Sequence, residues 1–215
     1  MKYSAVLFDL DGTLLYTLED IAAALNRALS AHGMPTLALD RVCASVGNGS
    51  KCLVELAVPA GTDQALADSV LRFYRADYDH NCDIKTRPYD GIPELLDTLK
   101  DRGVKLAVVS NKPDGAVKAL ATAHFPGIFT IAVGEGPRVR RKPAPDAVLA
   151  AMAELRVEKN TALYVGDSEV DIQTARNAGV ACVSAEWGFR TRQQLIEAGA
   201  FRIIRSPLEL VSIIE

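Results

Sequence analysis

Short apolar runs alternate with amphipathic segments along most of this chain. The apolar runs have the length of β-strands and cover residues 5–8, 105–109, 130–133, 162–165, 181–184 and 202–204. Between them the spacing is helical, as where Ile92, Leu95, Leu96 and Leu99 fall on one face. Because strands that alternate with helices imply βαβ crossovers, we predict an α/β fold. It is expected to be a Rossmann-like, doubly wound, mainly parallel sheet covered by helices on both faces.

Residues 16–89 break this alternation. A capping-box pattern, Thr17-Leu18-Glu19-Asp20, precedes a helical face that carries Leu18, Ile21, Ala22, Leu25 and Leu29. A second helical pattern over residues 63–78 aligns Leu66, Val70, Phe73, Tyr74 and Tyr78. No convincing strand pattern occurs in this stretch. We therefore predict a core of residues 1–15 and 90–215, and a helical cap of residues 16–89 inserted after the first strand.

The composition is that of an average globular protein. Of the 215 residues, 49% are hydrophobic and 24% are charged, which is enough to build a substantial core. The 24 basic and 27 acidic residues give a net charge of −3, which argues against nucleic-acid binding driven by bulk positive charge. The cysteines, at positions 43, 52, 82 and 182, form no CxxC pair and are expected to be buried free thiols.

Neither a membrane span nor a signal peptide is expected. No apolar run approaches the roughly 20 residues that a spanning helix needs. The N-terminal apolar run stops too early, at Asp9 and Asp11, for a signal peptide. We therefore expect a cytoplasmic protein with neither a membrane nor a nucleic-acid partner. Whether it is a monomer or a homodimer stays open.

Polar side chains follow four of the predicted strands or lie in the loops after them, on the side where open α/β sheets bind ligands. They are Asp9, Asp11 and Thr13 after the first strand, Ser110, Asn111 and Lys112 after the second, Lys142 after the third, and Asp167 and Asp171 after the fourth. Clustered carboxylates repel one another unless a divalent cation lies among them, and Mg²⁺ prefers oxygen ligands. A lysine and hydroxyls beside that ion would accommodate a phosphoryl group, which a carboxylate could attack.

Each of these features has an ordinary structural explanation when taken alone. The segment Asp9-Leu10-Asp11-Gly12 could be a turn or a calcium loop, although an EF-hand would need glycine where Leu14 stands. Asp167, Ser168 and Ser110 could be helix caps, and Lys142 could be an exposed lysine. Their joint occurrence, in order at four strand ends, favours phosphoryl-transfer chemistry.

These motifs resemble those of the haloacid dehalogenase-like (HAD) hydrolase superfamily, and within it most closely those of phosphoglycolate phosphatases. Residues 8–14 (Phe-Asp-Leu-Asp-Gly-Thr-Leu) resemble the first motif, Ser110 the second, Lys142 the third, and Gly166-Asp167-Ser168-x-x-Asp171 the fourth. Residues 46–49, 110–113, 141–145 and 165–179 add to the similarity, which extends from end to end of the chain. The resemblance implies a Rossmann-like core with an inserted helical cap, in agreement with the periodicity.

The resemblance also implies a Mg²⁺-dependent phosphatase that acts on a small phosphorylated metabolite, with 2-phosphoglycolate as the best single expectation. It implies that Asp9 becomes the phospho-aspartate and that Asp11 acts as general acid and then general base. The phosphoryl oxygens would be held by Thr13, Ser110, Asn111 and Lys142. The ligands of Mg²⁺ would be Asp9, the backbone carbonyl of Asp11, and Asp167. Asp171 would orient Lys142 or a metal-bound water.

Three further features concern the cap and its surroundings. Gly47, Asn48 and Lys51 belong to the expected specificity loop, although Lys51 could equally lie in a plain turn before a helix. Tyr16 stands where relatives commonly carry Asp, and we interpret it as a neutral substitution at the hinge. The basic cluster of Arg138, Arg140 and Arg141 either attracts an anionic substrate or lines a solvated loop.

Other functions remain open on the same scaffold. They are pyrophosphate hydrolysis, sugar phosphate mutation, and phosphonate cleavage with Lys51 as a Schiff base. The phosphonate reaction is disfavoured, because that branch is expected to lack an acid at position 11. A non-catalytic phospholigand-binding module is a further alternative, but it would be expected to have lost Asp9 or Asp11.

Overall fold

The core is built around a parallel sheet in the computed structural model, which describes residues 1–137 and 139–215. The sheet has six strands in the order β5-β4-β1-β6-β7-β8. In that order they span Ile131–Glu135, Lys105–Pro113, Ala5–Phe8, Ala162–Gly166, Ala181–Ala185 and Ile203–Ile204. Neighbouring strands are parallel, and each predicted strand overlaps one of the six. The predicted Rossmann-like α/β fold is confirmed.

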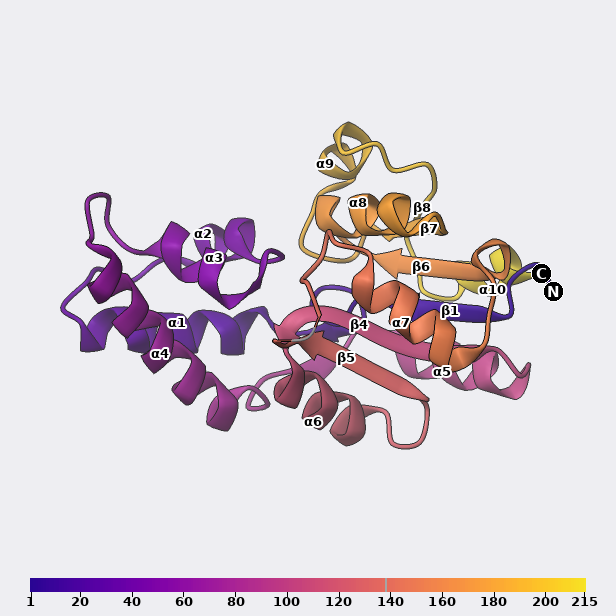
Figure 1. The fold of residues 1–215 in the computed structure, drawn as a ribbon, viewed down its shortest axis with the longest axis horizontal. Helices are drawn as coiled ribbons and strands as arrows, with labels where there is room; N and C mark the ends of the chain where they lie inside the picture. The colour runs from indigo at the N-terminus through magenta and orange to yellow at the C-terminus, as the bar shows by residue number, and fades with distance from the viewer. Residues whose placement is uncertain (138) are drawn as a thin grey trace.

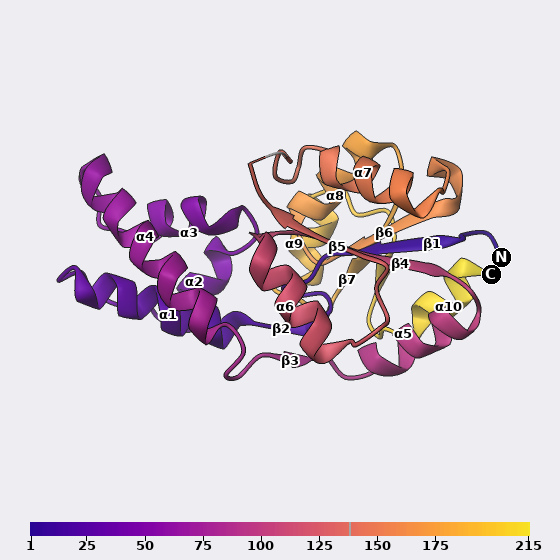
Figure 2. The ribbon, with the colours of Figure 1, turned by 60° about the horizontal axis from the view of Figure 1, so that its bottom comes forward.

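Two apolar layers cover the sheet, because alternate residues of β1 point to opposite faces. The helices of the core span Ile92–Asp101 (α5), Asp114–His124 (α6), Asp146–Leu155 (α7), Glu169–Ala178 (α8), Arg192–Glu197 (α9) and Glu209–Ile214 (α10). Val6 and Phe8 pack in the layer that contains α5, α6 and α10, whereas Ala5 and Leu7 pack with α7 and α8. Figure 2 shows these helices on both sides of the strands.

The inserted segment folds into helices that lie beside the core, at the end away from both chain termini (Figure 1). These helices span Leu18–Ala31 (α1), Leu39–Ser45 (α2), Gly49–Ala57 (α3) and Gln64–Asn81 (α4). The predicted apolar face of α1 is buried as expected. Within the described residues, none of the helices has the length and apolar character needed to cross a membrane.

The predicted apolar face of α4 is only partly correct. Val70, Tyr74 and Tyr78 are buried, but Leu66 is 38% exposed and Phe73 is 41% exposed. Each i, i+4 step along a helix advances about 40° beyond a full turn, so the row from 66 to 78 winds away from the neighbouring helix. Phe73 lies beside that row, and its ring packs edge-to-face against His32.

Two short strands join the cap to the core, so the expectation of no strand in residues 16–89 is wrong at both ends. β2 (Leu15–Tyr16) pairs antiparallel with β3 (Arg87–Pro88), with Tyr16 opposite Arg87. The Arg87 guanidinium lies 4.4 Å from the centroid of the Tyr16 ring, and Tyr89 packs edge-to-face on that ring. Tyr16 therefore stabilises the junction through its ring. A two-residue strand is too short to show an alternating pattern.

The predicted capping box at the start of α1 is also wrong. Thr17 makes no side-chain cap hydrogen bond within residues 1–137 and 139–215; its hydroxyl donates to Asp11 Oδ1 at 2.6 Å. The Asp20 carboxylate accepts hydrogen bonds from the backbone amides of residues 84, 85 and 86. These polar groups therefore bind other parts of the junction instead of the first turn of their own helix.

The four cysteines are free thiols, as predicted. Only Cys82 among them is buried, however, and the other three are partly exposed. The expectation that all four are buried is therefore wrong. Cys43 lies at the border between cap and core, where its sulfur is 3.7 Å from the backbone oxygen of Phe189.

Candidate active site

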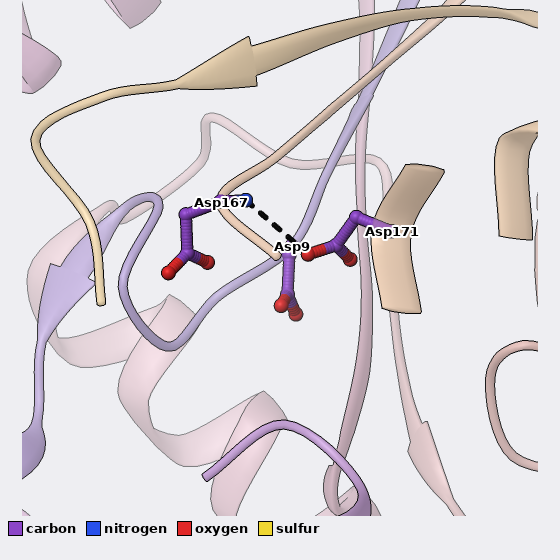
Figure 3. A group of neighbouring side chains, drawn as sticks. All are labelled: Asp9, Asp167 and Asp171. Carbon is purple, nitrogen blue, oxygen red and sulfur yellow. Dashed lines mark hydrogen bonds between the residues drawn. The ribbon is translucent and has the colours of Figure 1, made fainter. Parts of the chain in front are cut away.

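The acidic groups meet because β1 and β6 are in register. Phe8 lies opposite Val165, so Asp9 and Asp167 leave the sheet beside each other. Asp171, on the first turn of α8, lies next to them (Figure 3). One carboxylate oxygen from each residue lies within 4.8 Å of the others, and all three residues are buried. A buried cluster of this kind is unfavourable without positive charge nearby.

Asp9 is held by the next residue and by a lysine. Its Oδ1 accepts a hydrogen bond of 2.7 Å from the backbone N–H of Leu10, and it lies 2.9 Å from Lys142 Nζ. Burial raises the pKa of Asp9 to about 7, with the Asp171 charge adding to the effect and Lys142 opposing it. Asp9 therefore depends on nearby positive charge to stay ionised at neutral pH.

Lys142 supplies part of that charge. Its Nζ lies 2.7 Å from Asp171 Oδ1, 2.9 Å from Asp9 Oδ1 and 3.2 Å from the Tyr164 hydroxyl. Burial disfavours the ammonium, but Asp171 and Asp9 outweigh it and hold the pKa of Lys142 well above its usual value. The lysine is therefore a permanently charged group between two carboxylates.

Asp171 uses both of its carboxylate oxygens within the protein. Oδ1 faces Lys142, while Oδ2 accepts hydrogen bonds from the Ser168 hydroxyl at 2.7 Å and from the backbone amides of Asp167 and Ser168. The same contacts form a capping box at the start of α8. Asp171 thus ties the position of Lys142 to the first turn of a helix.

Asp167 is fixed by contacts from two loops. Its Oδ1 accepts from the Thr13 hydroxyl at 3.1 Å, and its Oδ2 accepts from the Phe189 backbone N–H at 2.7 Å. Burial, reinforced by Asp171 and Asp9, raises the pKa of Asp167 well above its ordinary value. Gly12 has a φ of +80°, and a Cβ atom there would overlap the Asp167 carboxylate. A glycine is therefore required at position 12 for both reasons.

Asp11 lies on the side of the site that faces the cap. Its Oδ1 accepts hydrogen bonds from the Thr17 hydroxyl at 2.6 Å and from Lys112 Nζ at 2.7 Å. The Lys112 side chain is only 3% exposed. Sequence analysis placed Lys112 at the end of the second strand but gave it no role. Its position two residues after Ser110 was the feature of the sequence that could have indicated a role in the site.

Ser110 and Asn111 are both buried at the end of β4, but they are used differently. Ser110 lines the pocket between core and cap. Asn111 Nδ2 donates to the backbone oxygens of Gly47 and Lys142, and Oδ1 accepts from the Lys142 backbone N–H. The Asn111 side chain therefore connects the Lys142 loop and the cap loop to the sheet, and its predicted phosphate contact stays a prediction.

A pocket lies between the carboxyl ends of the strands and the cap. Asp9, Asp11, Ser110 and Asp167 line it from the core. The cap contributes Ile21, Val46, Gly47, Gly49, Ser50, Leu53, Tyr74 and Tyr78. The cap side is thus mostly apolar and aromatic, which suits a site that excludes water from a small substrate.

The predicted specificity loop reaches this pocket only in part. Gly47 and Gly49 line it, whereas neither Asn48 nor Lys51 is among its lining residues in the described part of the chain. The Lys51 side chain is 53% exposed and lies 3.8 Å from Glu55, one turn further along α3. Because α3 begins at Gly49, Ser50 and Leu53 face inward while Lys51 points to solvent.

The basic cluster is largely outside the site. Arg138 lies outside the described residues. Arg140 is exposed and binds Asp146 on α7 at 3.0 Å, and Arg141 is also exposed. Among residues 139–142, the structure therefore places only Lys142 in the buried carboxylate cluster.

Sequence analysis missed Arg190, in the loop after β7. Its guanidinium donates to the backbone oxygens of Cys43 and Val46 in the cap, and it lies 2.9 Å from Glu169 on α8. The preceding residue, Phe189, binds Asp167. One loop thus contacts both the carboxylate cluster and the cap. No local pattern in the sequence indicated this, because all the partners are distant in the chain.

Known proteins resemble this chain over nearly its whole length. Residues 6–185 match the family model described as haloacid dehalogenase-like hydrolase. A phosphoglycolate phosphatase from Pseudomonas syringae pv. tomato is 35% identical over 212 residues, which cover 96% of this chain and 78% of that protein. An N-acetylmuramic acid 6-phosphate phosphatase from Pseudomonas aeruginosa is 31% identical over 217 residues, which cover 100% and 96%. A crystal structure from Lactobacillus delbrueckii subsp. bulgaricus, provisionally named a phosphoglycolate phosphatase, has 37% identity and a TM-score of 0.94, with 100% and 99% covered.

Proposed function

This chain belongs to the haloacid dehalogenase-like hydrolase family, and on that premise we propose that it is a Mg²⁺-dependent phosphomonoesterase with 2-phosphoglycolate as its substrate. The observation that carries the proposal is the shared contact of Lys142 with Asp9 and Asp171 inside a buried carboxylate cluster. The arrangement supports phosphoryl transfer, because a carboxylate that could act as nucleophile lies beside a fixed positive charge.

The donor set fits a magnesium ion. Asp9 and Asp167 have raised pKa values because they are buried and lie near the charge of Asp171, so a divalent cation would favour ionisation of both. The carboxylates of Asp9 and Asp167 and the backbone carbonyl of Asp11 would hold the ion. Asp171 is better suited to positioning, since both of its oxygens already bind Lys142 and the start of α8. When bound, Mg²⁺ neutralises charge on the phosphoryl oxygens.

The residues suit a two-step hydrolysis. A carboxylate oxygen of Asp9 attacks phosphorus and forms the phospho-aspartate, while the alcohol leaves with a proton from Asp11. Asp11 then accepts a proton from the water that attacks phosphorus, and Asp9 is released with inorganic phosphate. Lys142, Ser110 and Thr13 would hold the phosphoryl oxygens in both steps. In the free protein Thr13 hydrogen-bonds Asp167, beside the place where the phosphoryl group would lie.

Two relatives suggest different substrates for this site. The name of the 35% identical relative supports 2-phosphoglycolate. N-acetylmuramic acid 6-phosphate is the second candidate, because the relative of that specificity matches 100% of this chain. Phosphonate cleavage through Lys51 is disfavoured further, since Lys51 is exposed and outside the pocket lining.

A substrate panel tests the proposal. The values of kcat/KM would be measured with and without Mg²⁺ for 2-phosphoglycolate, N-acetylmuramic acid 6-phosphate, glucose 6-phosphate, pyrophosphate and phosphonoacetaldehyde. We expect Mg²⁺-dependent hydrolysis with 2-phosphoglycolate as the best substrate. A clear preference for N-acetylmuramic acid 6-phosphate would make that compound the substrate in place of 2-phosphoglycolate. Absence of turnover with every phosphomonoester would refute the proposed reaction.

A further inference from the structure

The hydroxyl of Tyr78 is a buried polar group that the fold leaves without a partner. Tyr78, on α4 of the cap, is 1% exposed and lines the pocket. Its hydroxyl has no hydrogen-bond partner within residues 1–137 and 139–215. Burial raises the pKa of Tyr78 well above its usual value, so the hydroxyl keeps its proton and can donate it. Buried polar groups are almost always paired, so the Tyr78 hydroxyl requires an acceptor from outside the protein, either a water molecule or a ligand.

The ring that carries this hydroxyl is held firmly. It stacks on Tyr74, one turn earlier in α4, with ring centroids 5.5 Å apart and an interplanar angle of 15°. On the core side, Lys112 Nζ lies 4.6 Å from the centroid of the Tyr78 ring. The Tyr78 ring is therefore part of a preformed surface, in which an aromatic side chain of the cap meets a lysine of the core.

Lys112 brings a buried positive charge to the same part of the pocket. Its Nζ lies 2.7 Å from Asp11 Oδ1, the oxygen that also accepts from Thr17. No hydrogen bond to Asp11 Oδ2 is found in the described part of the chain, so this oxygen is the one available to the leaving group. Arg190 also lines the pocket, but its guanidinium is already bound by Glu169 and by cap carbonyls. The positive charge available to an anionic group on the leaving alcohol would therefore be the Lys112 ammonium.

We propose that the Lys112 ammonium and the Tyr78 hydroxyl together bind the carboxylate of a short phosphorylated 2-hydroxy acid, the carboxylate lying one carbon from the ester oxygen. This inference rests on the proposed phosphatase activity, and it names the groups that would select the substrate. Asp11 would donate its proton to the ester oxygen of the substrate. Lys112 contacts Asp11, so a carboxylate on the next carbon would lie within its reach. The carboxylate would also supply the acceptor that the Tyr78 hydroxyl lacks.

The test compares two substrates that differ in one charge. They are 2-phosphoglycolate and 2-hydroxyethyl phosphate. The second is called the neutral analogue, because its leaving alcohol is uncharged and of similar size. Tyr78→Phe removes only the hydroxyl and keeps the ring on Tyr74. We expect its kcat/KM for 2-phosphoglycolate to fall about 10-fold, mainly through KM, because a hydrogen bond to a charged group is lost. Its kcat/KM for the neutral analogue should change less than about 2-fold.

Lys112→Met provides the second variant. Because Lys112 also holds Asp11, kcat should fall for both substrates, so the informative quantity is the ratio of the two kcat/KM values. We expect this ratio to fall about 10-fold or more in Lys112→Met and to recover in part in Lys112→Arg. Lys118→Met, which removes an exposed lysine paired with Asp114, is the control and should leave the ratio unchanged.

The outcomes separate the two proposals. If both variants hydrolyse the two substrates with the wild-type ratio, the carboxylate site is refuted, while the phosphatase activity stands. If the wild-type protein with Mg²⁺ hydrolyses neither substrate nor p-nitrophenyl phosphate, the proposed activity itself is refuted. A folding defect in Lys112→Met would leave Tyr78→Phe as the deciding variant, because that change removes no hydrogen bond found among the described residues.

Discussion

The hydroxyl of Thr17 donates a 2.6 Å hydrogen bond to Asp11, so the residue that precedes the first cap helix directly holds the proposed general acid. Thr17 follows the β2 strand of the two-stranded ribbon that joins cap and core. The side chain of Asp11 is therefore linked to the position of the cap. This hydrogen bond fixes the side chain of the proposed general acid relative to the first helix of the cap.

Thr17→Val should weaken this link while keeping the shape of the side chain. We expect kcat to fall about 10-fold with little change in KM, because Asp11 loses one of the two donors that hold its Oδ1. Thr17→Ser, which retains the hydroxyl, should stay close to wild type. Equal kcat values for the valine and serine variants would show that the hydrogen bond does not contribute.

Asp9→Asn should abolish turnover and leave the fold intact. The amide keeps an oxygen that can accept from the Leu10 backbone N–H, but it is a poor nucleophile and a weak metal ligand. Loss of a nucleophile typically costs about 10⁴-fold or more in kcat. Steady-state hydrolysis with thermal unfolding as the control measures this. A variant with near-normal kcat would rule out the covalent role of Asp9.

The free protein should lose stability as the pH rises from about 4 to about 7. The folded-state pKa of Asp9 is raised to about 7 by burial, so folded Asp9 retains a proton that the unfolded chain releases near pH 4. The folded state binds more protons in this window, and the free energy of unfolding therefore falls with increasing pH. The comparison is of Tm between pH 5 and pH 8 in EDTA.

Magnesium should counteract that loss. Metal binding needs deprotonated carboxylates, so the increase in Tm caused by Mg²⁺ should be larger at pH 8 than at pH 5. Asp9→Asn, which has no carboxyl proton at this position, should show a weaker pH dependence in EDTA and a smaller response to Mg²⁺. A Tm that is unaffected by Mg²⁺ at pH 8 would argue against the metal site.

Arg190→Met should loosen the cap. The substitution keeps an apolar stem but removes the hydrogen bonds to the backbone oxygens of Cys43 and Val46. We expect KM to rise about 5-fold to 10-fold and the amides of α2 to exchange hydrogen faster, because two contacts that close the pocket are lost. Arg192→Gln is the matched control, since Arg192 is an exposed neighbour that binds only Glu186 in the described part of the chain. Similar exchange in both variants would contradict this role of Arg190.

Much of the architecture and of the acidic site was accessible from local patterns. The strands have buried apolar runs, and the residues directly after β1 and β6 are both acidic. Asp9 and Asp167 could thus be placed at one edge from the sequence alone, since the carboxyl ends of parallel strands meet there. Lys142 and Asp171 were identified by motif resemblance, and in the structure they form an ion pair of 2.7 Å.

Only the tertiary structure decided how the cap meets this edge. The contacts of Lys112, Tyr78 and Arg190 join segments up to 147 residues apart. Hydrophobic periodicity cannot predict contacts of this kind. The same holds for Lys51, whose direction depends on where α3 begins, and for Thr17, whose hydroxyl bonds Asp11 instead of its own helix. Periodicity and strand-end chemistry depend on neighbours in the chain, and so they determined the sheet and its acidic edge. The orientation of side chains across a domain boundary depends on packing between distant segments, and so it required the folded molecule.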